Sequence, residues 1–387
     1  MKVRKLLMKG RKLYMKFTCN KANLDHVVSI VQKAVKSNST VRILEGIYIE
    51  AVDNKVKLVG YDLATGIEAE IPADVMREGT VVINSKIFGD IIRKLPDDMI
   101  SITSDSMNNV VIESGSACFN IKGLGSEEYP KIPTIENNNK IILPQAILKK
   151  MISSTIFAVS KDEHRQNLNG CYFECDGSNI TLVAVDGFRM AIRTSHVGSE
   201  YPIMNFIVPG KSLNEAAKIF DDKNDDDEVI LYTSNNHILF DIGNVKIVSR
   251  LITEEFIAYK SIIAHNPQSV VTINKQLMLD AIERASIVIS AESGDHRASV
   301  DISMNNDQMI TIEAITEHGN SKESIPAEIS GNNIDISFNS RFFIDVLKNV
   351  EDEQICIEFN GSVGPCFIKP LDGEAYTYML LPLRRNS

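Results

Sequence analysis

Three segments of this chain share one helix pattern that places cations opposite an apolar stripe. They are residues 84–95, 209–220 and 339–350, and each carries five apolar or small residues at helical spacing. Lys or Arg stands just before each stripe and again seven residues later, at Lys86, Arg93, Lys211, Lys218, Arg341 and Lys348. At about 100° per residue, the stripe and the basic positions fall on opposite sides of a helix. Three such helices indicate a repeated surface suited to an anionic partner.

The repeat has a period of a whole domain. Residues 126–130 (Ser-Glu-Glu-Tyr-Pro) are echoed by residues 253–257 (Thr-Glu-Glu-Phe-Ile), and residues 59–62 by residues 183–186. Such a period indicates tandem domains rather than the short unit of a solenoid. We therefore expect a basic, flexible extension over residues 1–14, followed by three domains over residues 15–138, 139–266 and 267–387. Linkers are expected at 136–140 and 264–269. Met15 is a second possible start.

The local patterns predict an α+β fold with two helices in each domain. Short β-branched runs such as residues 56–59, 180–183 and 309–312 alternate as antiparallel strands do. Three further helices are expected at 20–37, 144–160 and 274–290, each opened by Asn or Pro. Small sheets of this kind expose unpaired edges unless neighbouring domains join edge to edge. A homo-oligomer would close such a chain of domains into a ring.

Charge is sorted between the helices and the rest of the chain. The formal charge is −10, and six cations lie in the first fourteen residues, so the remainder carries about −16. The six expected helices sum to about +8, which predicts a diffuse cationic lining in an otherwise acidic protein. The alternative is that lysines simply favour solvated helix faces. Trp is absent, and single-strand binders usually stack bases on aromatic rings, so duplex phosphate is the expected ligand.

Composition indicates an intracellular, non-membrane protein. Six scattered cysteines fit a reducing compartment, and Cys171 and Cys175 are expected to be buried thiols on one face of a strand. The basic N-terminus lacks the apolar core of a signal peptide, and no stretch is apolar for about 18 residues. We expect a cytoplasmic location.

No motif for catalysis, a metal or a cofactor is present. Gly210-Lys211-Ser212 resembles the end of a phosphate-binding loop, but Asn205 stands where that loop requires Gly. Asp62 and Asp186 recur at one strand end, where acids usually cap turns. Two alternatives remain open: a nucleic-acid hydrolase that uses Asp62 and Asp186 as acids, and a structural assembly protein that never meets DNA.

Several blocks resemble the bacterial sliding clamp family, the beta subunit of DNA polymerase III. They are Met15-Lys16-Phe17, Glu128-Tyr129-Pro130, Leu168-Asn169-Gly170, residues 183–190 (Val-Ala-Val-Asp-Gly-Phe-Arg-Met) and residues 379–384 (Met-Leu-Leu-Pro-Leu-Arg). The resemblance implies three domains of one fold and a head-to-tail homodimer that encircles and slides on duplex DNA, without sequence preference. It also implies a non-catalytic processivity factor without cofactors. The implied partners are the DNA polymerase III catalytic subunit, a clamp loader, and other polymerases and repair proteins that bind through short peptides.

The resemblance also assigns residues. A peptide pocket between the second and third domains would include Leu168, Val185, Gly187, Phe188, Arg189, Met190, Ile257, Ile262, Val363, Pro365, Met379, Leu380, Leu381, Pro382, Leu383 and Arg384. The DNA-lining residues would be the six cations named above and the loop residue Arg165. Asn38, Arg42 and Ile257 depart from the family pattern, which affects a DNA contact and the pocket. Pro382 predicts that the last segment is an exposed edge, the alternative being that it only completes a strand.

Overall fold

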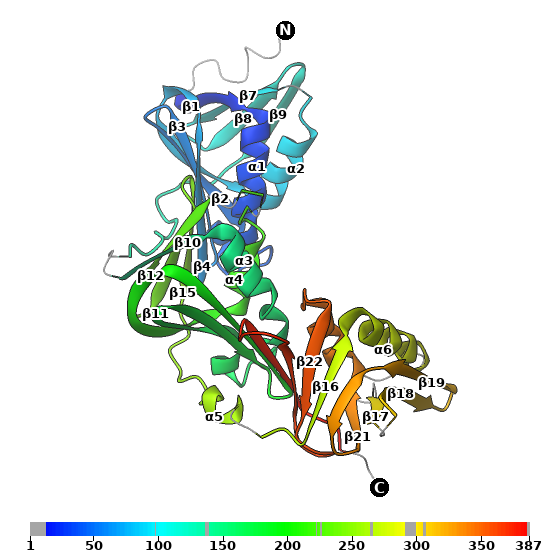
Figure 1. Ribbon diagram of the computed structural model, residues 1–387. Coiled ribbons are helices and arrows are strands. Elements are labelled where there is room, and N and C mark those ends of the chain that lie inside the picture. The colour runs from blue at the N-terminus through cyan, green and yellow to red at the C-terminus, as the bar shows by residue number, and fades with distance from the viewer. Residues whose placement is uncertain are drawn as a thin grey trace. The chain divides into compact units, whose positions relative to one another are not determined.

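The computed structural model describes most of the chain (Figure 1). The described residues are 13–96, 98–135, 139–221, 223–224, 227–263, 266–290, 299–304 and 307–384. Nearly all of the expected N-terminal extension and parts of both expected linkers therefore lie outside the described residues. Among the described residues, no helix combines the length and the apolarity that a membrane crossing requires.

The contacts of the chain group it into two compact units. Unit 1 comprises residues 1–145 and 218–251, and unit 2 comprises residues 146–217 and 252–387. This division cuts through the expected second domain, because strands of that segment pair with strands of both flanking segments.

Unit 1 contains two antiparallel sheets and two α-helices. One sheet has the order β5 (Asp74–Arg77), β1 (Leu13–Asn20), β7 (Met99–Asp105), β8 (Asn109–Ser114), β9 (Ala117–Lys122). The other has the order β10 (Asn139–Pro144), β13 (Glu228–Thr233), β14 (His237–Asp241), β15 (Val245–Arg250), β4 (Thr65–Pro72), β3 (Lys55–Tyr61), β2 (Gly46–Val52), β6 (Gly79–Asn84). The helices are α1 (Lys21–Val31) and α2 (Ser85–Lys94).

Unit 2 also contains two antiparallel sheets. The larger has the order β11 (Gly170–Val185), β12 (Arg189–Pro209), β24 (Tyr376–Leu380), β23 (Cys366–Pro370), β22 (Gln354–Phe359), β16 (Ser269–Asn274), β20 (Glu328–Gly331). The smaller has the order β19 (Gly319–Pro326), β18 (Met309–Thr316), β17 (Ser299–Met304), β21 (Ile334–Asn339). Its helices are α3 (Gln145–Ser153, whose first residue belongs to unit 1), α4 (Gly210–Ala217), α5 (Tyr259–Ile263), α6 (Lys275–Ser290) and α7 (Ser340–Lys348).

All six expected helices are present, but α1 ends at Val31 and α3 at Ser153, before the expected ends at residues 37 and 160. Four of the six begin at an asparagine. The side chains of Asn20, Asn84, Asn274 and Asn339 each accept a hydrogen bond from a backbone N–H of the first helical turn. Such a bond satisfies a donor that the helix itself cannot pair. The helix α5 was not predicted, because its five residues are too few to show a period.

Most positions of the three apolar stripes are buried, but Ile87 is exposed, and Phe342 and Ala217 are half-buried. Phe88, Leu213 and Phe343 are fully buried, as the spacing predicts. Ile87 was expected in the same buried stripe, but its side chain is 51% exposed. The expectation was wrong there because Ile87 lies on the border of the stripe and lines a surface hollow beside β9 instead of the core.

Strands from neighbouring parts of the sequence pair edge to edge. In unit 1, β15 pairs antiparallel with β4, from Val245 opposite Ala69 to Ser249 opposite Thr65. In unit 2, β12 pairs antiparallel with β24, with Arg189 opposite Leu380. Both contacts satisfy backbone groups that isolated sheets would leave unpaired. The expected edge pairing between neighbouring domains is therefore confirmed at both junctions.

Candidate functional site

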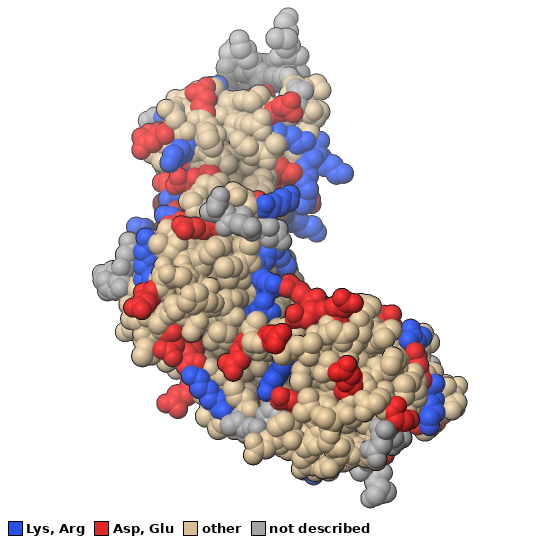
Figure 2. Space-filling view, viewed as in Figure 1, with Lys and Arg blue, Asp and Glu red and all other residues tan. Residues whose placement is uncertain are grey.

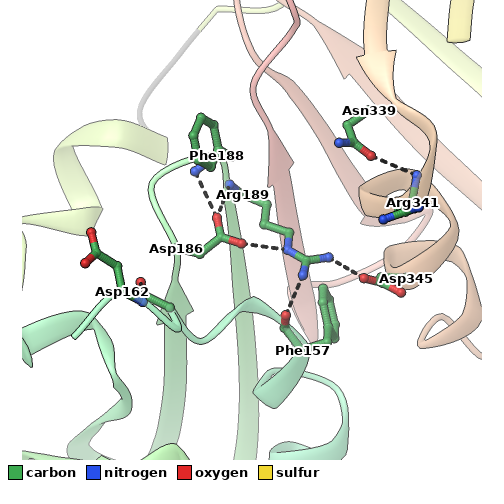
Figure 3. Close-up of polar contacts among 9 residues, drawn as sticks. Phe157, Asp162, Asp186, Phe188, Arg189, Asn339, Arg341 and Asp345 are labelled. Atoms are coloured by element: carbon green, nitrogen blue, oxygen red, sulfur yellow. Dashed lines mark hydrogen bonds and ion pairs between the residues drawn. The ribbon is translucent and has the colours of Figure 1, made fainter. Parts of the chain in front are cut away.

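A tight turn after β11 organises the centre of unit 2. Asp186 Oδ1 accepts hydrogen bonds from the backbone N–H groups of Phe188 and Arg189, at 2.9 and 3.0 Å (Figure 3). In unit 1, Asp62 Oδ1 accepts from Ala64 N and Thr65 N in the same way, at 3.1 and 2.7 Å. The two recurring acids thus cap turns, which is the role that their position at a strand end predicts.

Arg189 is a buried cation that connects the start of β12 to α7. Its Nε donates to Asp186 Oδ2 at 2.9 Å, and its terminal nitrogens donate to Asp345 Oδ2 at 2.5 Å and to the Phe157 carbonyl at 2.7 Å (Figure 3). Its guanidinium carbon also lies 4.4 Å from the centroid of the Phe342 ring. A planar group that donates to three separate acceptors and also lies over an aromatic ring is a use that Arg suits and Lys does not.

Phe342 therefore has a different role from the rest of its stripe on α7. Its ring is only half-buried, and it lies between Arg189 and Phe188, with ring centroids of Phe188 and Phe342 6.2 Å apart. Asp345 lies four residues after Arg341 and three before Lys348, so Arg189 meets α7 beside these two exposed positions.

An apolar cluster covers one face of the large sheet, on the side opposite Arg189. Its buried members come from β11, β12, β23, β24, the turn before β11, and α5: Leu168, Val183, Val185, Met190, Ile192, Tyr259, Phe367 and Met379. Because side chains alternate along a strand, Met190 and Met379 join this cluster while their neighbours Arg189 and Leu380 face the other way. The cluster is a preformed apolar surface of the kind that receives apolar side chains of a ligand.

A segment that contains α5 lies over this cluster. The rings of Tyr172 and Phe256 stack with centroids 4.8 Å apart, and Tyr172 meets Tyr259 edge-on at 6.1 Å. Glu174 anchors α5, because it accepts a hydrogen bond from the Tyr259 hydroxyl and another from Lys260 Nζ at 2.7 Å. Burial and the bond to Glu174 raise the pKa of Tyr259. Burial alone would raise the pKa of Glu174, but the hydrogen bonds from Lys260 and Tyr259 outweigh it and lower that pKa.

The structure brings part of the expected pocket together. Leu168, Val185, Met190 and Met379 belong to the apolar cluster, and Ile257 packs against it. Phe188 is 60% exposed, and the backbone N–H of Leu381 donates to its carbonyl at 2.9 Å. Exposed side chains also include those of Ile262, Leu381, Arg384 and Val363, the last of which is 91% exposed.

Other expected pocket residues lie elsewhere. Leu380 is buried on the face of the sheet that Arg189 occupies, while Pro382 and Leu383 are half-buried beyond the strand. Pro365 is half-buried before β23, and its carbonyl accepts from Asn360 N at 3.3 Å.

The expected exposed edge at the C-terminus was wrong. The strand β24 lies inside the large sheet, between β12 and β23. Pro382 does not interrupt this pairing, because the strand ends at Leu380 before the proline is reached. The chain beyond is held by Leu383 N, which donates to the Ser337 carbonyl at 2.8 Å.

Several residues of the site were missed by sequence reasoning. They are Val183, Ile192 and Phe367 within the cluster, Tyr172, Phe256, Tyr259 and Ile263 in its cover, and Phe342 beside Arg189. The alternation of β11 and β12 could have suggested Val183 and Ile192, since each lies two positions from an expected pocket residue. Phe342 carried no such signal, because its spacing assigned it to the buried stripe of α7.

The expected DNA-lining cations are divided between the units. Lys86, Arg93 and Lys218 belong to unit 1, and Lys211, Arg341, Lys348 and Arg165 belong to unit 2. All seven are exposed, as the helical spacing predicts for six of them. Figure 2 shows Lys and Arg gathered on the side of unit 1 that carries α1 and α2 in Figure 1. Within unit 2, Lys and Arg also lie close to α3 and α4.

Some of these cations are locally compensated. Arg93 pairs with Asp90 at 2.5 Å, Lys348 pairs with Glu283 at 2.8 Å, and all four side chains are exposed. Exposed ion pairs contribute little stability, so these cations can exchange partners at small cost. Arg165 lies at the pocket: a Cβ added to Gly187 would meet its guanidinium nitrogen at 2.7 Å. Gly187 has a φ of +94°, which also favours glycine.

The chain matches three family models in sequence order. They describe the N-terminal domain of the DNA polymerase III beta subunit at residues 15–133, its central domain at 142–257 and its C-terminal domain at 260–384. The chain belongs to the DNA polymerase III beta subunit family. The sequence of this chain is 33% identical over 381 residues to that of the beta sliding clamp of Bacillus subtilis, and the match covers 96% of this chain and 100% of that protein. It is 32% identical over 379 residues to the beta sliding clamp of Staphylococcus epidermidis, covering 96% and 99%.

Solved structures agree with this beta-subunit assignment. The DNA polymerase sliding clamp of Bacillus subtilis superposes with a TM-score of 0.92 at 33% identity, covering 96% of this chain and 100% of that one. The beta subunit of Thermotoga maritima superposes with a TM-score of 0.89 at 27% identity, with the same coverage.

We predict that Arg189→Ala destabilises this beta subunit by roughly 2–3 kcal/mol. It would leave Asp186 Oδ2, whose side chain is only 15% exposed, and the Phe157 carbonyl without their Arg189 partner, which costs more than the loss of a surface pair. Urea unfolding should show the change, whereas Arg93→Ala, which removes an exposed pair, should alter the free energy of unfolding by less than about 1 kcal/mol. Equal effects of the two substitutions would contradict the role assigned to Arg189.

Proposed function

We propose that this chain is a processivity factor that encircles duplex DNA as a head-to-tail homodimer and tethers replication and repair proteins. The chain itself performs no bond chemistry. Membership of the beta subunit family over nearly the whole chain is the observation that carries the proposal. We propose three domains with boundaries near residues 138 and 266, and a cytoplasmic location.

The DNA contact is proposed to be diffuse. Lys86, Arg93, Lys218, Lys211, Arg341 and Lys348 are exposed on the sides of their helices opposite the buried stripes. Weak phosphate contacts carry no sequence information and exchange readily, which permits sliding. A closed ring retains DNA by topology, so no single contact needs to be strong. The departures Asn38 and Arg42 fit this scheme, because a diffuse lining does not depend on one residue.

Two strand edges, those of β9 and β19, support the proposed dimer, because they resemble the edges that pair within the chain. In both junctions, the last strand of one meander pairs with the last strand of another: β4 with β15, and β12 with β24. The strand β19 ends a corresponding meander in unit 2, and β9 ends one in unit 1, and each lies at an edge of its sheet. Pairing β19 with β9 of a second copy repeats the same contact, and two such pairings close a ring.

Apolar surface lies beside both of these edges. Next to β9 there is a hollow of about 370 Å³ whose apolar lining includes Ile83, Ile87, Ile121 and Leu124. In unit 2, α6 packs against β18 and β19, and Ile287 on α6 and Ile315 on β18 are each 69% exposed. Apolar side chains that fill an apolar hollow are the usual anchors of a protein interface. We propose that the hollow receives α6 of the second copy.

The peptide pocket is proposed to lie on the apolar cluster of unit 2. The buried walls around Met190 and Met379 would take one apolar side chain of a partner, and the exposed group of Phe188, Leu381 and Val363 would take another. Ile257 packs at the edge of this cluster, where the family usually has proline. The proposed partners are the DNA polymerase III catalytic subunit, a clamp loader, and other polymerases and repair proteins. The clamp acts by raising the effective concentration of the tethered enzyme at the DNA.

The contacts of Asp62 and Asp186 argue against the hydrolase alternative, which needs both residues as catalytic acids. Asp62 and Asp186 each have one carboxylate oxygen that accepts hydrogen bonds from backbone N–H groups of a turn, and Asp186 also binds Arg189. Among the described residues, no group of three or more His, Cys, Asp or Glu side chains could hold a metal ion.

We predict that the protein, once loaded on a nicked circular duplex by a clamp loader, stays bound at high salt and dissociates when the circle is cut. Salt weakens phosphate contacts but cannot open a closed ring. Gel filtration of labelled protein with circular and linearised DNA would measure retention. Dissociation at the same rate from both DNA forms would contradict topological holding.

We predict that Ile287→Asp weakens the dimer by at least about tenfold, because a carboxylate would have to be buried against the apolar part of the hollow, formed by Ile83, Ile87, Ile121 and Leu124. Sedimentation equilibrium would measure the dissociation constant. The control is Ile203→Asp, at a position that is 81% exposed on β12 and outside the proposed interface. A dimer unaffected by Ile287→Asp, or equally weakened by both substitutions, would contradict the proposed seam.

We predict that Phe188→Ala weakens binding of a clamp-binding peptide by about tenfold or more, as truncation of an aromatic anchor commonly does. Because Phe188 is exposed, the fold and the dimer should be unchanged. Fluorescence anisotropy with a labelled peptide would measure the affinity, with Ile203→Ala as the control. Full affinity in Phe188→Ala would place the peptide elsewhere.

A further inference from the structure

A second hollow lies on the same face of the large sheet, beyond the apolar cluster. Its volume is about 850 Å³, and β11, β12, β22, β23, β24 and α5 contribute to its lining. Figure 1 shows α5 on one side of β11 and β12, and α3 and α4 on the other. The hollow therefore lies on the α5 side, away from the exposed cations of α4.

The hollow is continuous with the apolar cluster. Ile192 and Tyr259 belong to the cluster and also line the hollow, and Ile263, which packs against the cluster, lines it as well. The lining changes character along the strands: Ile192 on β12 is followed by Thr194, and Thr181 on β11 bonds Thr194 at 3.0 Å between their hydroxyl oxygens. A chain that fills the apolar cluster can thus continue along the sheet into a polar hollow.

The charges of the hollow are unbalanced. Its lining includes four carboxylates and two lysines, and both lysines are already paired. Lys260 binds Glu174 at 2.7 Å, and Lys369 binds Glu358 at 2.6 Å. Asp176 and Glu374 are exposed, and neither forms an ion pair within the part of the chain that the structure describes. The hollow therefore presents a net negative charge beside an apolar surface.

The chemistry of this lining selects the occupant. Among the described residues, no His, Cys, Asp or Glu group has the arrangement that would hold a metal ion, so a bound cation does not account for the carboxylates. An anionic ligand would be repelled by Asp176 and Glu374. An extended peptide with Lys or Arg side chains fits, because the threonine hydroxyls can bond its backbone and the two carboxylates can pair with its cations.

We propose that this hollow is a second docking site for a basic segment that flanks the apolar clamp-binding peptide in the same partner chain. The inference rests on the proposed function, since the apolar cluster must hold the first part of that peptide. The hollow then discriminates among partners: those with a basic flank bind more tightly than those with a neutral or acidic flank. Linking the two contacts makes the second one intramolecular, so weak pairs suffice.

The test compares labelled peptides that share one apolar motif and differ in a flank of three lysines, three glutamines or three glutamates, on either side of the motif. We expect the lysine flank, on one side only, to bind the full-length protein roughly fivefold more tightly than glutamine at low salt, from one or two exposed pairs. The glutamate flank should bind more weakly than glutamine. The lysine advantage should shrink as salt screens the exposed charges.

The variant Asp176→Asn/Glu374→Gln should abolish the lysine advantage and leave the affinity for the glutamine peptide unchanged. A matched variant, Asp307→Asn/Glu328→Gln, removes two exposed carboxylates of unit 2 outside the hollow and should retain the advantage. An advantage that survives the first variant, or falls equally in both, would overturn the inference while the apolar pocket stands. Failure of the glutamine peptide to bind at all would overturn the proposed peptide pocket and this inference together.

Discussion

The organisation of this beta subunit depends on the pairing of sheet edges between successive parts of the chain. The pairings of β4 with β15 and of β12 with β24 join successive parts of the chain into continuous sheets. They also explain why the compact units do not coincide with the sequence repeat, since a shared sheet makes contacts across a domain boundary as dense as those within it. The edges of β9 and β19 can pair in the same way with a second copy of the chain. Two such pairings would close the proposed ring.

The junction between β12 and β24 also creates the candidate site. One face of this sheet holds Arg189, which fixes α7 through Asp345 and the Phe342 ring. The opposite face holds the apolar cluster and, beyond it, the acidic hollow. Strand alternation therefore separates a structural contact from the apolar cluster within two adjacent residues, Arg189 and Met190. The corresponding turn at Asp62 in unit 1 has Thr65 in place of that arginine, and Asp62 Oδ1 accepts hydrogen bonds from Ala64 N and Thr65 N.

A counterpart of the apolar cluster in unit 1 is filled by the chain itself. Tyr129, from the segment echoed by residues 253–257, packs with Val59, Tyr61 and Val82. Its hydroxyl donates to the Val59 carbonyl at 3.2 Å. In unit 2, the echoing segment packs Phe256 and Ile257 only partly over the cluster and leaves the neighbouring Phe188 and Val363 exposed. The same repeat thus gives a closed core in one unit and an exposed apolar surface in the other.

The sequence by itself determined the positions of the six helices, the asparagine caps of four of them, most of the buried stripe positions and the exposed cations, because these follow from local spacing and from capping within one turn. It favoured turn caps for Asp62 and Asp186 but left a catalytic role for them open. Only the tertiary structure decided that β24 lies inside a sheet, that Phe342 receives Arg189, and that Ile87 lines a hollow. The first two outcomes depend on contacts between residues more than a hundred positions apart, and the third on β9, about thirty residues after Ile87. No local pattern in the sequence specifies these contacts.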